Sequence, residues 1–522
     1  MVAGGALQID LGGVASDTQV NGGSVFISGG AAIRMHIQSG GNVATAVGGV
    51  ASGAVVGSGG TLEAGDNGVI RGASVRAGGE VIVGFGVDEQ GSAIGDVVWS
   101  SGIEVVSIGG ATTGTRILAG GNQYVFGSAP GEWLGGGGSD FVAGSAAGDV
   151  VESGGTATVL WGGVATHAAV VSGGTMVVDS SGTVSASVVS GGVKQWATAL
   201  FVSSGGLTER VTVSGRGASE GVNSGGTASG GVIEGDALLW IAQGATAEAM
   251  VISSNGIVST YGTLDRVTIV GGDVQVAGLV SGGVVRGSGG LIVSSGGRAY
   301  DVTLSGSPII EYIGTGGLVS GGAVEDGAHV YLQGSATAEA QFIDGGIIDT
   351  FGVISGDVIA GANLTVEDGG TAEADRLTSR FASEYVSAGG TARGGSVANG
   401  AQLEVSSAGT AAAITVLSGG TLEVLSGGTA DAVLAGRSGT VIVQSGASAS
   451  FLSGNVLAVS AGAQVFDIAL DPAQHFAGLV PLVSADAAGG TDITLAASST
   501  VQNGGSVLVV AVSSGGVAFA HS

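Results

Sequence analysis

The chain of 522 residues contains 108 glycines, four prolines and no cysteine, and 44% of its residues are hydrophobic. This composition excludes collagen, which needs proline and a three-residue glycine period, and a disordered linker, which would lack the hydrophobic residues. It also excludes disulfides and cysteine nucleophiles, while 41 acidic against 14 basic residues, a net charge of −27, exclude nucleic acid and anionic lipid as partners.

Glycine pairs recur along the chain, starting near its N-terminus. Short runs rich in Val, Ala and Ile lie between pairs at 12–13, 22–23, 29–30, 40–41, 48–49 and 59–60. Such runs are typical of short β-strands, and glycine is typical of the corners between them. Neither a basic and apolar leader nor a run of about 18 apolar residues is visible. We therefore expect no signal peptide and no membrane insertion within this chain.

Residues 128–150 depart from this pattern, because Pro130 and Trp133 interrupt it, and we expect an irregular loop there. Within it, residues 135–142 read GGGGSDFV and fit the calcium-binding nonapeptide pattern G-G-x-G-x-D-x-U-x. Asp140 would supply a carboxylate to Ca²⁺, and Asp149, nine residues further on, would belong to a degenerate second copy. Calcium sites of this kind need several consecutive copies, so a loop without metal is the alternative interpretation.

The stretch from 154 to 192 shows the repeat in its clearest form, with glycine pairs beginning at 154, 173 and 191 and hence periods of 19 and 18 residues. Each copy holds two strand-like runs. One copy cannot bury its apolar face alone but a stack can, so the pattern predicts an all-β, parallel β-helix of about 19-residue turns over residues 1–455. Alternation predicts that Thr156 and His167 face outward. The predicted inward pairs are Ala157 with Met176, Val159 with Val178, Ala168 with Ala186, and Val170 with Val188.

Catalytic constellations are not indicated, and we expect that the chain is not an enzyme and has no cofactor other than the possible calcium. The histidines show no spacing that suits a metal or an acid–base pair, and they stand at 36, 167, 329, 475 and 521. The densest charged patch is interpreted as a salt-bridged loop rather than as catalytic carboxylates. Its members are Glu373, Asp375, Arg376, Arg380 and Glu384. Trp161, Trp196 and Trp240 are interpreted as structural aromatics, with sugar stacking as the alternative.

The repeat fades near residue 455. Residues 456–522 contain fewer glycine pairs, and Pro472 and Pro481 lie among them. An uncovered solenoid end would offer a strand edge to other molecules. We therefore expect residues 456–522 to form a C-terminal β cap.

Four of the glycine corners read (S/A)-G-G-T-A, at 153–157, 224–228, 388–392 and 426–430. With these corners, nearly the whole chain resembles the AIDA-type repeat passenger domains of self-associating autotransporter adhesins from Gram-negative bacteria. The tail after Val465 is similar to the cap that precedes the translocation barrel, although no barrel follows within this chain. The resemblance implies a right-handed β-helix, a place at the cell surface or outside the cell, and adhesion. It also makes Ser172, Ser190 and Ser204 candidates for glycosylation.

The function expected from these features is that of a non-enzymatic, extended surface that mediates adhesion and self-association, as in cell aggregation and biofilm formation. The expected partners are further copies of the chain, side by side or as a filament, and host or bacterial surface glycans. Two alternatives stay open. One is a self-assembling structural filament, secreted or intracellular, and the other is a polysaccharide lyase or hydrolase built on a β-helix.

Overall fold

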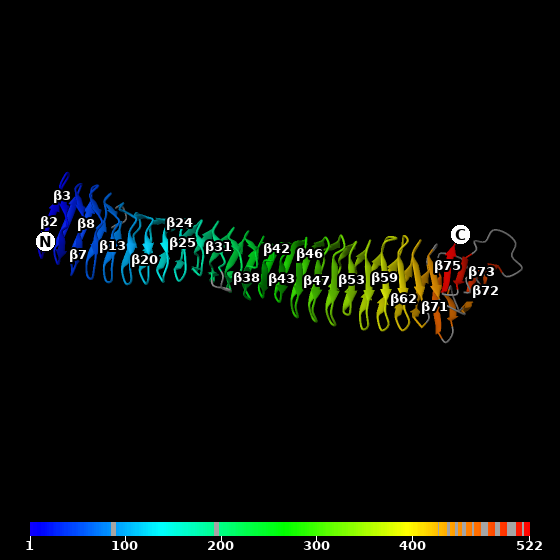
Figure 1. The fold of residues 1–522 in the computed structure, drawn as a ribbon. Helices are drawn as coiled ribbons and strands as arrows, with labels where there is room; N and C mark the ends of the chain where they lie inside the picture. Colours follow the sequence, from blue (N-terminus) through cyan, green and yellow to red (C-terminus); the bar gives the residue numbers. More distant parts are fainter. Residues whose placement is uncertain are drawn as a thin grey trace. The chain divides into compact units, whose positions relative to one another are not determined.

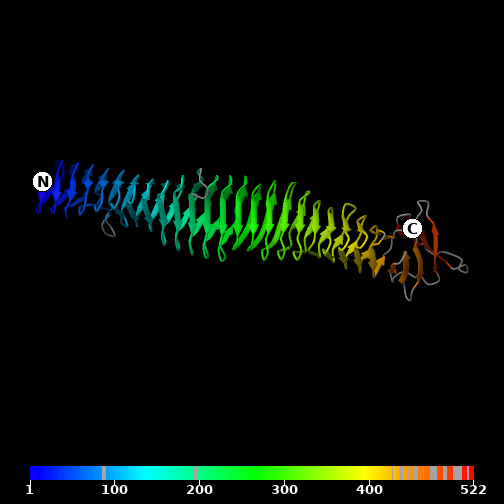
Figure 2. The same cartoon turned by 60° about the horizontal axis from the view of Figure 1, so that its bottom comes forward.

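The structure is a computed structural model that describes the chain with gaps (Figures 1 and 2). The residues outside the description are 85–89, 193–197, 426, 436–438, 444–446, 452–455, 462–463, 471–478, 486–490, 498–507, 514–515 and 522. The described chain is a parallel β-solenoid of about 22 turns spaced by about 19 residues, and it contains no helix. The predicted fold class is thus confirmed. The chain divides into two compact units, residues 1–267 and 268–522.

A regular turn has three strands. The turn that starts at Thr156 runs through β26 (Thr156–Val159), β27 (Val164–Thr166) and β28 (Ala169–Val170). A four-residue corner precedes β27, and another follows β28. Between β27 and β28 the chain bends at His167, whose φ of 55° lies in the left-handed region. The sequence predicted two strands per copy, because this bend is made by a residue other than glycine and leaves no glycine signal.

The side-chain register confirms half of the predicted inward pairs. Ala157 lies beside Met176 and Val159 beside Val178, and all four are buried. The second half of the prediction is wrong by one residue, because Val170 pairs with Val189, and Val188 is 40% exposed. The cause is that Gly191 and Gly192 do not form the next equivalent corner. Thr175 pairs with Ala199 of the next turn, so the turn that starts at Thr175 has 24 residues.

The four- and five-residue strands of unit 1 stack in parallel register and form one face of its turns; we call them the long strands. Glycine fits the corner before such a strand, because a Cβ on Gly174, directly before β29, would collide with the Val151 carbonyl of the preceding turn. The long strands of unit 1 are β2 (Ala6–Ile9), β5 (Ser24–Ser28), β8 (Asn42–Ala46), β11 (Thr61–Ala64), β14 (Glu80–Val83), β17 (Ile103–Val106), β20 (Asn122–Val125), β23 (Ser139–Val142), β26, β29 (Thr175–Val178), β32 (Thr198–Val202), β35 (Ala218–Val222), β38 (Leu238–Ile241) and β41 (Ile257–Thr260).

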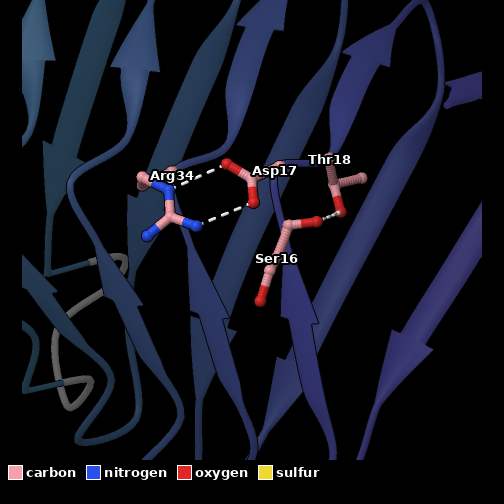
Figure 3. A network of polar contacts seen from close by, with 4 residues as sticks. All are labelled: Ser16, Asp17, Thr18 and Arg34. Atoms are coloured by element: carbon pink, nitrogen blue, oxygen red, sulfur yellow. Dashed lines mark hydrogen bonds and ion pairs between the residues drawn. The ribbon is translucent and has the colours of Figure 1, made fainter.

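The bends between the short strands also stack from turn to turn. Asp17 and Arg34 start successive bends, with φ of 50° and 54°. Their side chains point outward, and Arg34 Nε and Nη2 donate hydrogen bonds to Asp17 Oδ1 and Oδ2 at 2.8 and 2.7 Å (Figure 3). The hydrogen bonds from Arg34 lower the pKa of Asp17. Next to them, the Thr18 hydroxyl donates to the Ser16 carbonyl at 3.4 Å. At the second of these bends the next residue, Met35, faces inward and is 1% exposed.

The irregular loop predicted near 128–150 is wrong. These residues form β21 (Ser128–Pro130), β22 (Trp133–Leu134), β23, β24 (Ser145–Ala147) and β25 (Val150–Val151), all paired in parallel with their neighbours. The turn is only shortened, because two residues, 126–127, form its corner where four are usual. Pro130 is accommodated at the end of a short strand, and Trp133 has its ring next to Arg116 at 4.9 Å from the ring centroid.

In the first turns of unit 2 one eight-residue strand, β44 (Leu279–Arg286) or β46 (Arg298–Ser305), replaces the two short strands. Three-strand turns follow from β47 on, and the pairing changes near the end of the unit. From β69 (Ala447–Phe451) to β71 (Gln464–Leu470) the strands are antiparallel, through β70 (Val456–Ala461). A separate antiparallel sheet follows, with β72 (Leu479–Ala485), β73 (Thr491–Ala497), β74 (Leu508–Ser513) and β75 (Gly516–His521). The cap function of residues 456–522 stays a prediction. The long strands of unit 2 are β43 (Asp273–Val276), β45 (Gly290–Val293), β47 (Ile310–Ile313), β50 (His329–Leu332), β53 (Ile347–Thr350), β56 (Asn363–Val366), β59 (Ser383–Val386), β62 (Gln402–Val405), β65 (Thr421–Val424) and β68 (Thr440–Val443).

Candidate interaction face

The outward side of nine consecutive long strands in unit 1, β17 to β41, carries no charged residue. Along each strand the second and fourth of the stacked positions are buried, so the first and third face outward. We call these outward positions the charge-free face. Its residues are Ile103, Val105, Asn122, Tyr124, Ser139, Phe141, Thr156, Thr158, Thr175, Val177, Ala199, Phe201, Ser219, Gly221, Leu238, Trp240, Ile257 and Ser259.

Aromatic side chains run along this face. The rings of Tyr124 and Phe141 stack across neighbouring strands, with centroids 5.1 Å apart and an interplanar angle of 11°. Phe201 lies over Gly221, since a Cβ there would meet the Phe201 ring at 3.2 Å. Phe201 remains 42% exposed and Trp240 39% exposed. The outward positions of these parallel strands thus include a row of half-exposed apolar and aromatic side chains.

The short strands of the same unit present charge instead. Arg71 and Arg116 end or begin short strands and face outward, and Glu209, Glu234 and Glu248 do so further along. Arg266 at one bend donates to Glu248 Oε2 at 3.0 Å. Charge is therefore distributed unevenly around the turn. The long-strand side between residues 103 and 259 is the uncharged side of an otherwise acidic protein.

The calcium candidates Asp140 and Asp149 lie inside the solenoid. Asp140 occupies an inward position of β23 and is fully buried, and Asp149 follows the bend after β24 and is 2% exposed. They belong to a set of polar side chains that fills the interior of consecutive turns and that we call the interior polar cluster. Its members are Asp96, Glu104, Thr112, Thr115, Gln123, Glu132, Asp140 and Asp149. No group of three or more potential ligands in the described chain is arranged to hold a metal ion, and a calcium site stays a prediction.

Hydrogen bonds connect part of the interior polar cluster. Thr112 Oγ1 donates to Glu132 Oε1 at 2.9 Å, and Gln123 Nε2 donates to Glu104 Oε2 at 3.3 Å. The Glu132 amide donates to Asp149 Oδ1 at 3.1 Å. Other oxygens, including both carboxyl oxygens of Asp140, have no partner in the described chain. The buried residues of the described chain include no Lys, Arg or His, so burial favours the protonated forms of these carboxyl groups.

Burial is the largest cause of the pKa shifts in this cluster. It raises the pKa of Asp149 to about 6, of Asp96 to about 7 and of Glu132 to about 10. The pKa values of Glu104 and Asp140 are raised well above their ordinary range, because burial and neighbouring carboxylates both disfavour the charged form. The sequence interpretation missed this cluster. The sequence does contain a signal for the inward position of Asp140, because Asp140 occupies the same position in its strand as Ala157 does in the next long strand.

The predicted salt-bridged loop at 373–384 is wrong. Asp375 and Glu384 face the interior of unit 2 and are 2% and 4% exposed, whereas Arg376 and Arg380 are outside. Among the described residues of this patch no ion pair is formed. Asp375 Oδ1 instead accepts a hydrogen bond from the Asp357 amide at 2.9 Å. Burial raises the pKa of Asp375 to about 7 and of Glu384 to about 8.

The remaining candidates are dispersed. His36 and His167 are exposed, as predicted for His167, and His329 Nε2 lies 2.8 Å from Asp349 Oδ2. His475, Trp196 and the side chain of His521 lie outside the described residues. Trp161 is 66% exposed at the corner that follows β26, and it is not one of the outward strand positions of the charge-free face, which include Trp240. Of the glycosylation candidates, Ser172 and Ser204 are exposed at corners and Ser190 is half-buried.

Comparison with known proteins leaves this chain without an established family. No family model matches it, and no curated protein matches it. Among solved structures it is similar to the TibC-catalysed hyper-glycosylated TibA55-350 fragment, with 21% identity over 82% of this chain and 96% of that chain. The TM-score is 0.22. At this value the two chains do not superpose as wholes, so the likeness carries no argument about function.

Proposed function

We propose that this protein is a non-enzymatic, extended adhesin that associates with further copies of itself, side by side, through the charge-free face. Nine consecutive long strands without an outward charge, in a chain of net charge −27, are the observation that carries the proposal. In line with the resemblance of its SGGTA corners, we propose that it acts at the surface of a Gram-negative cell, where such association would join cells.

A second copy is the occupant that suits this face best. The face repeats at the strand spacing of about 4.8 Å, and a surface with the same repeat can match it along its whole length. Two acidic chains repel each other at long range, and this repulsion is weakest where neither presents a carboxylate. Contact between two such faces would bury Tyr124, Phe201 and Trp240, which are half-exposed in one copy.

Sedimentation velocity tests the proposal. The wild-type chain is expected to form dimers or larger species as its concentration rises. Replacing Phe201→Glu and Trp240→Glu together is expected to leave monomers, because each face would then bring carboxylates against the other. Added salt is expected to strengthen wild-type association, because it screens the repulsion between acidic chains without weakening apolar contact.

Trp161→Glu is the control, since it introduces one carboxylate, against two in the double variant, at an exposed tryptophan outside the charge-free face. It should associate like the wild type. A wild-type chain that stays monomeric at every concentration would contradict the proposal, as would equal loss of association in the control. Electron microscopy adds a further readout, in which long end-to-end filaments would favour the structural-filament alternative over lateral pairing.

A further inference from the structure

Unit 2 has a surface groove of about 540 Å³ at the end of β53, the strand labelled in Figure 1. Its origin is one shortened corner. Four residues, 333–336, connect β50 to β51 (Thr337–Glu339), and four more, 367–370, connect β56 to β57 (Thr371–Glu373). Between them, only Phe351 and Gly352 connect β53 to β54 (Val353–Ser355). Two long corners thus flank a short one, and the space between them is the groove.

Backbone hydrogen bonds to the preceding turn hold the short corner in place. The Phe351 amide donates to the Leu332 carbonyl at 2.9 Å, and the Val353 amide donates to the Ala336 carbonyl at 2.9 Å. The Gly352 amide donates to Thr350 Oγ1 at 3.1 Å. A Cβ on Gly352 would collide with the Ala336 carbonyl, so glycine is required for this close approach. The groove is therefore a fixed feature of the backbone.

Aromatic rings line one side of the groove. Tyr331 and Phe351 have centroids 5.7 Å apart and are tilted by 55°. Tyr331 also stacks on Tyr312 of the preceding turn, with centroids 5.6 Å apart and an interplanar angle of 12°. This stacking holds the Tyr331 ring in place. The tilted pair presents ring faces and edges to the groove, both half-exposed to solvent.

Polar groups line the rest of the groove. Thr315 supplies a hydroxyl, Gln333 an amide and Asp368 an exposed carboxylate. Together with the two aromatic residues they make a surface that offers apolar ring faces in the centre and both hydrogen-bond donors and acceptors at the rim. No basic residue lines the groove. A negatively charged ligand would therefore be repelled by Asp368 and by the chain's net charge of −27.

We infer that this groove binds a neutral oligosaccharide. The C–H faces of a sugar ring suit the Tyr331 and Phe351 rings, and its hydroxyl groups suit Gln333, Thr315 and Asp368. An open groove between two corners admits a chain that continues at both ends, whereas a small molecule would leave most of its surface in water. The inference concerns a different unit and different residues from the self-association proposed above, and it does not depend on that proposal.

Calorimetric titration and saturation-transfer NMR on the full chain test the inference. The probes are chitohexaose, maltohexaose and cellohexaose as neutral sugars, and hexagalacturonate as an acidic sugar of equal length. At least one neutral probe is expected to bind saturably, and hexagalacturonate is expected not to bind. Phe351→Ala is expected to weaken binding at least about tenfold, a change of about 1.4 kcal/mol.

Two more variants separate binding from folding. Gln333→Ala and Asp368→Asn change side chains at the rim, leave the buried positions intact and are expected to weaken binding severalfold. Phe126→Ala is the matched control, because Phe126 begins a two-residue corner in unit 1 that is followed by another two-residue corner, 143–144. That position lacks the second long wall, and its replacement should leave binding unchanged.

The possible results separate clearly. Saturable binding that Phe351→Ala weakens and Phe126→Ala does not would support the groove. Absence of saturable binding by every neutral probe at millimolar concentration would overturn the inference, and so would binding that survives both Phe351→Ala and Gln333→Ala. Sedimentation of these variants is expected to match the wild type, so the outcome is independent of the self-association test.

Discussion

Two neighbouring stretches of unit 1, residues 92–151 and 156–189, share one backbone and bury different side chains. Their long strands pair in the same parallel register, from β20 through β23 and β26 to β29. The inward positions hold Gln123 and Asp140 in the first stretch, and Ala157 and Met176 in the second. Corners, bends and the hydrogen-bond ladder therefore specify the turn, and the interior accepts whatever fits between them.

The difference has an energetic consequence. An aliphatic interior stabilises the turns at every pH, because hydrophobic burial does not involve a proton. A carboxyl interior stabilises them only in its protonated form, because the charged form would lose its hydration without gaining a cation. The interior polar cluster should therefore make one stretch of the solenoid sensitive to pH while the next is not.

Raising the pH is expected to have the largest effect on this comparison. A carboxyl whose pKa is higher in the folded than in the unfolded chain contributes most stability below its unfolded pKa near 4, and this contribution is lost as the pH rises toward the folded value. The folded pKa values are about 6 for Asp149, about 7 for Asp96 and about 10 for Glu132. Summed over these carboxyls, the turns of 92–151 should lose on the order of 8 kcal/mol from pH 5 to pH 8.

Hydrogen exchange measures this loss locally, which matters because long repeat arrays need not unfold in one step. Amides of β20 and β23 should lose protection between pH 5 and pH 8, after correction for the intrinsic exchange rate. Those of β26 and β29 should lose less. Equal loss in both pairs of strands would show that the interior carboxyls do not control the stability of their own turns.

Glu132→Gln should reduce the contrast between the stretches. The amide keeps an oxygen for the hydrogen bond from Thr112, which Glu132 now accepts at 2.9 Å, and it cannot ionise. The variant should gain about 5 kcal/mol at pH 8 and almost nothing at pH 4, because the carboxyl is protonated there in both states. Thermal unfolding followed by circular dichroism measures both values. Glu152→Gln, at a half-exposed corner, is the control and should change neither.

Met176→Ala probes the apolar stretch. Met176 is 1% exposed and lies between Ala157 and Leu200 in the register, so truncation leaves a cavity in the interior. We expect a loss of about 2 to 3 kcal/mol, the same at pH 5 and pH 8. Denaturant unfolding at the two pH values measures it. A loss that changed with pH would mean that the carboxyl cluster is coupled to turns beyond its own.

The sequence alone predicted the repeat length, the parallel solenoid and the inward Ala157, Met176, Val159 and Val178, because alternation and glycine pairs are local signals. It failed where a prediction depends on which residues of successive turns lie beside each other in the register. The corner at Gly191 looked like the next copy, although the ladder places that copy further on. Asp140 was expected in an irregular loop, although its register places it in a strand with its side chain in the core. The charge-free face could have been read from outward positions, but only after the register of all nine strands was known.

Replacing a corner glycine by alanine is expected to have the smallest effect on stability. It tests directly whether the corners contribute equally in the two stretches. Gly120 lies in the polar stretch and Gly162 in the apolar one, with φ of 78° and 75°. A Cβ would have room at both, since the nearest atom to Gly120 is 3.5 Å away and nothing lies within 4 Å at Gly162. Alanine should therefore destabilise each site by about 1 kcal/mol through its backbone conformation alone. If unfolding experiments give equal losses, independent of pH, then corners specify the turn regardless of the interior. Unequal losses would show that the interior side chains determine how much stability a corner substitution costs.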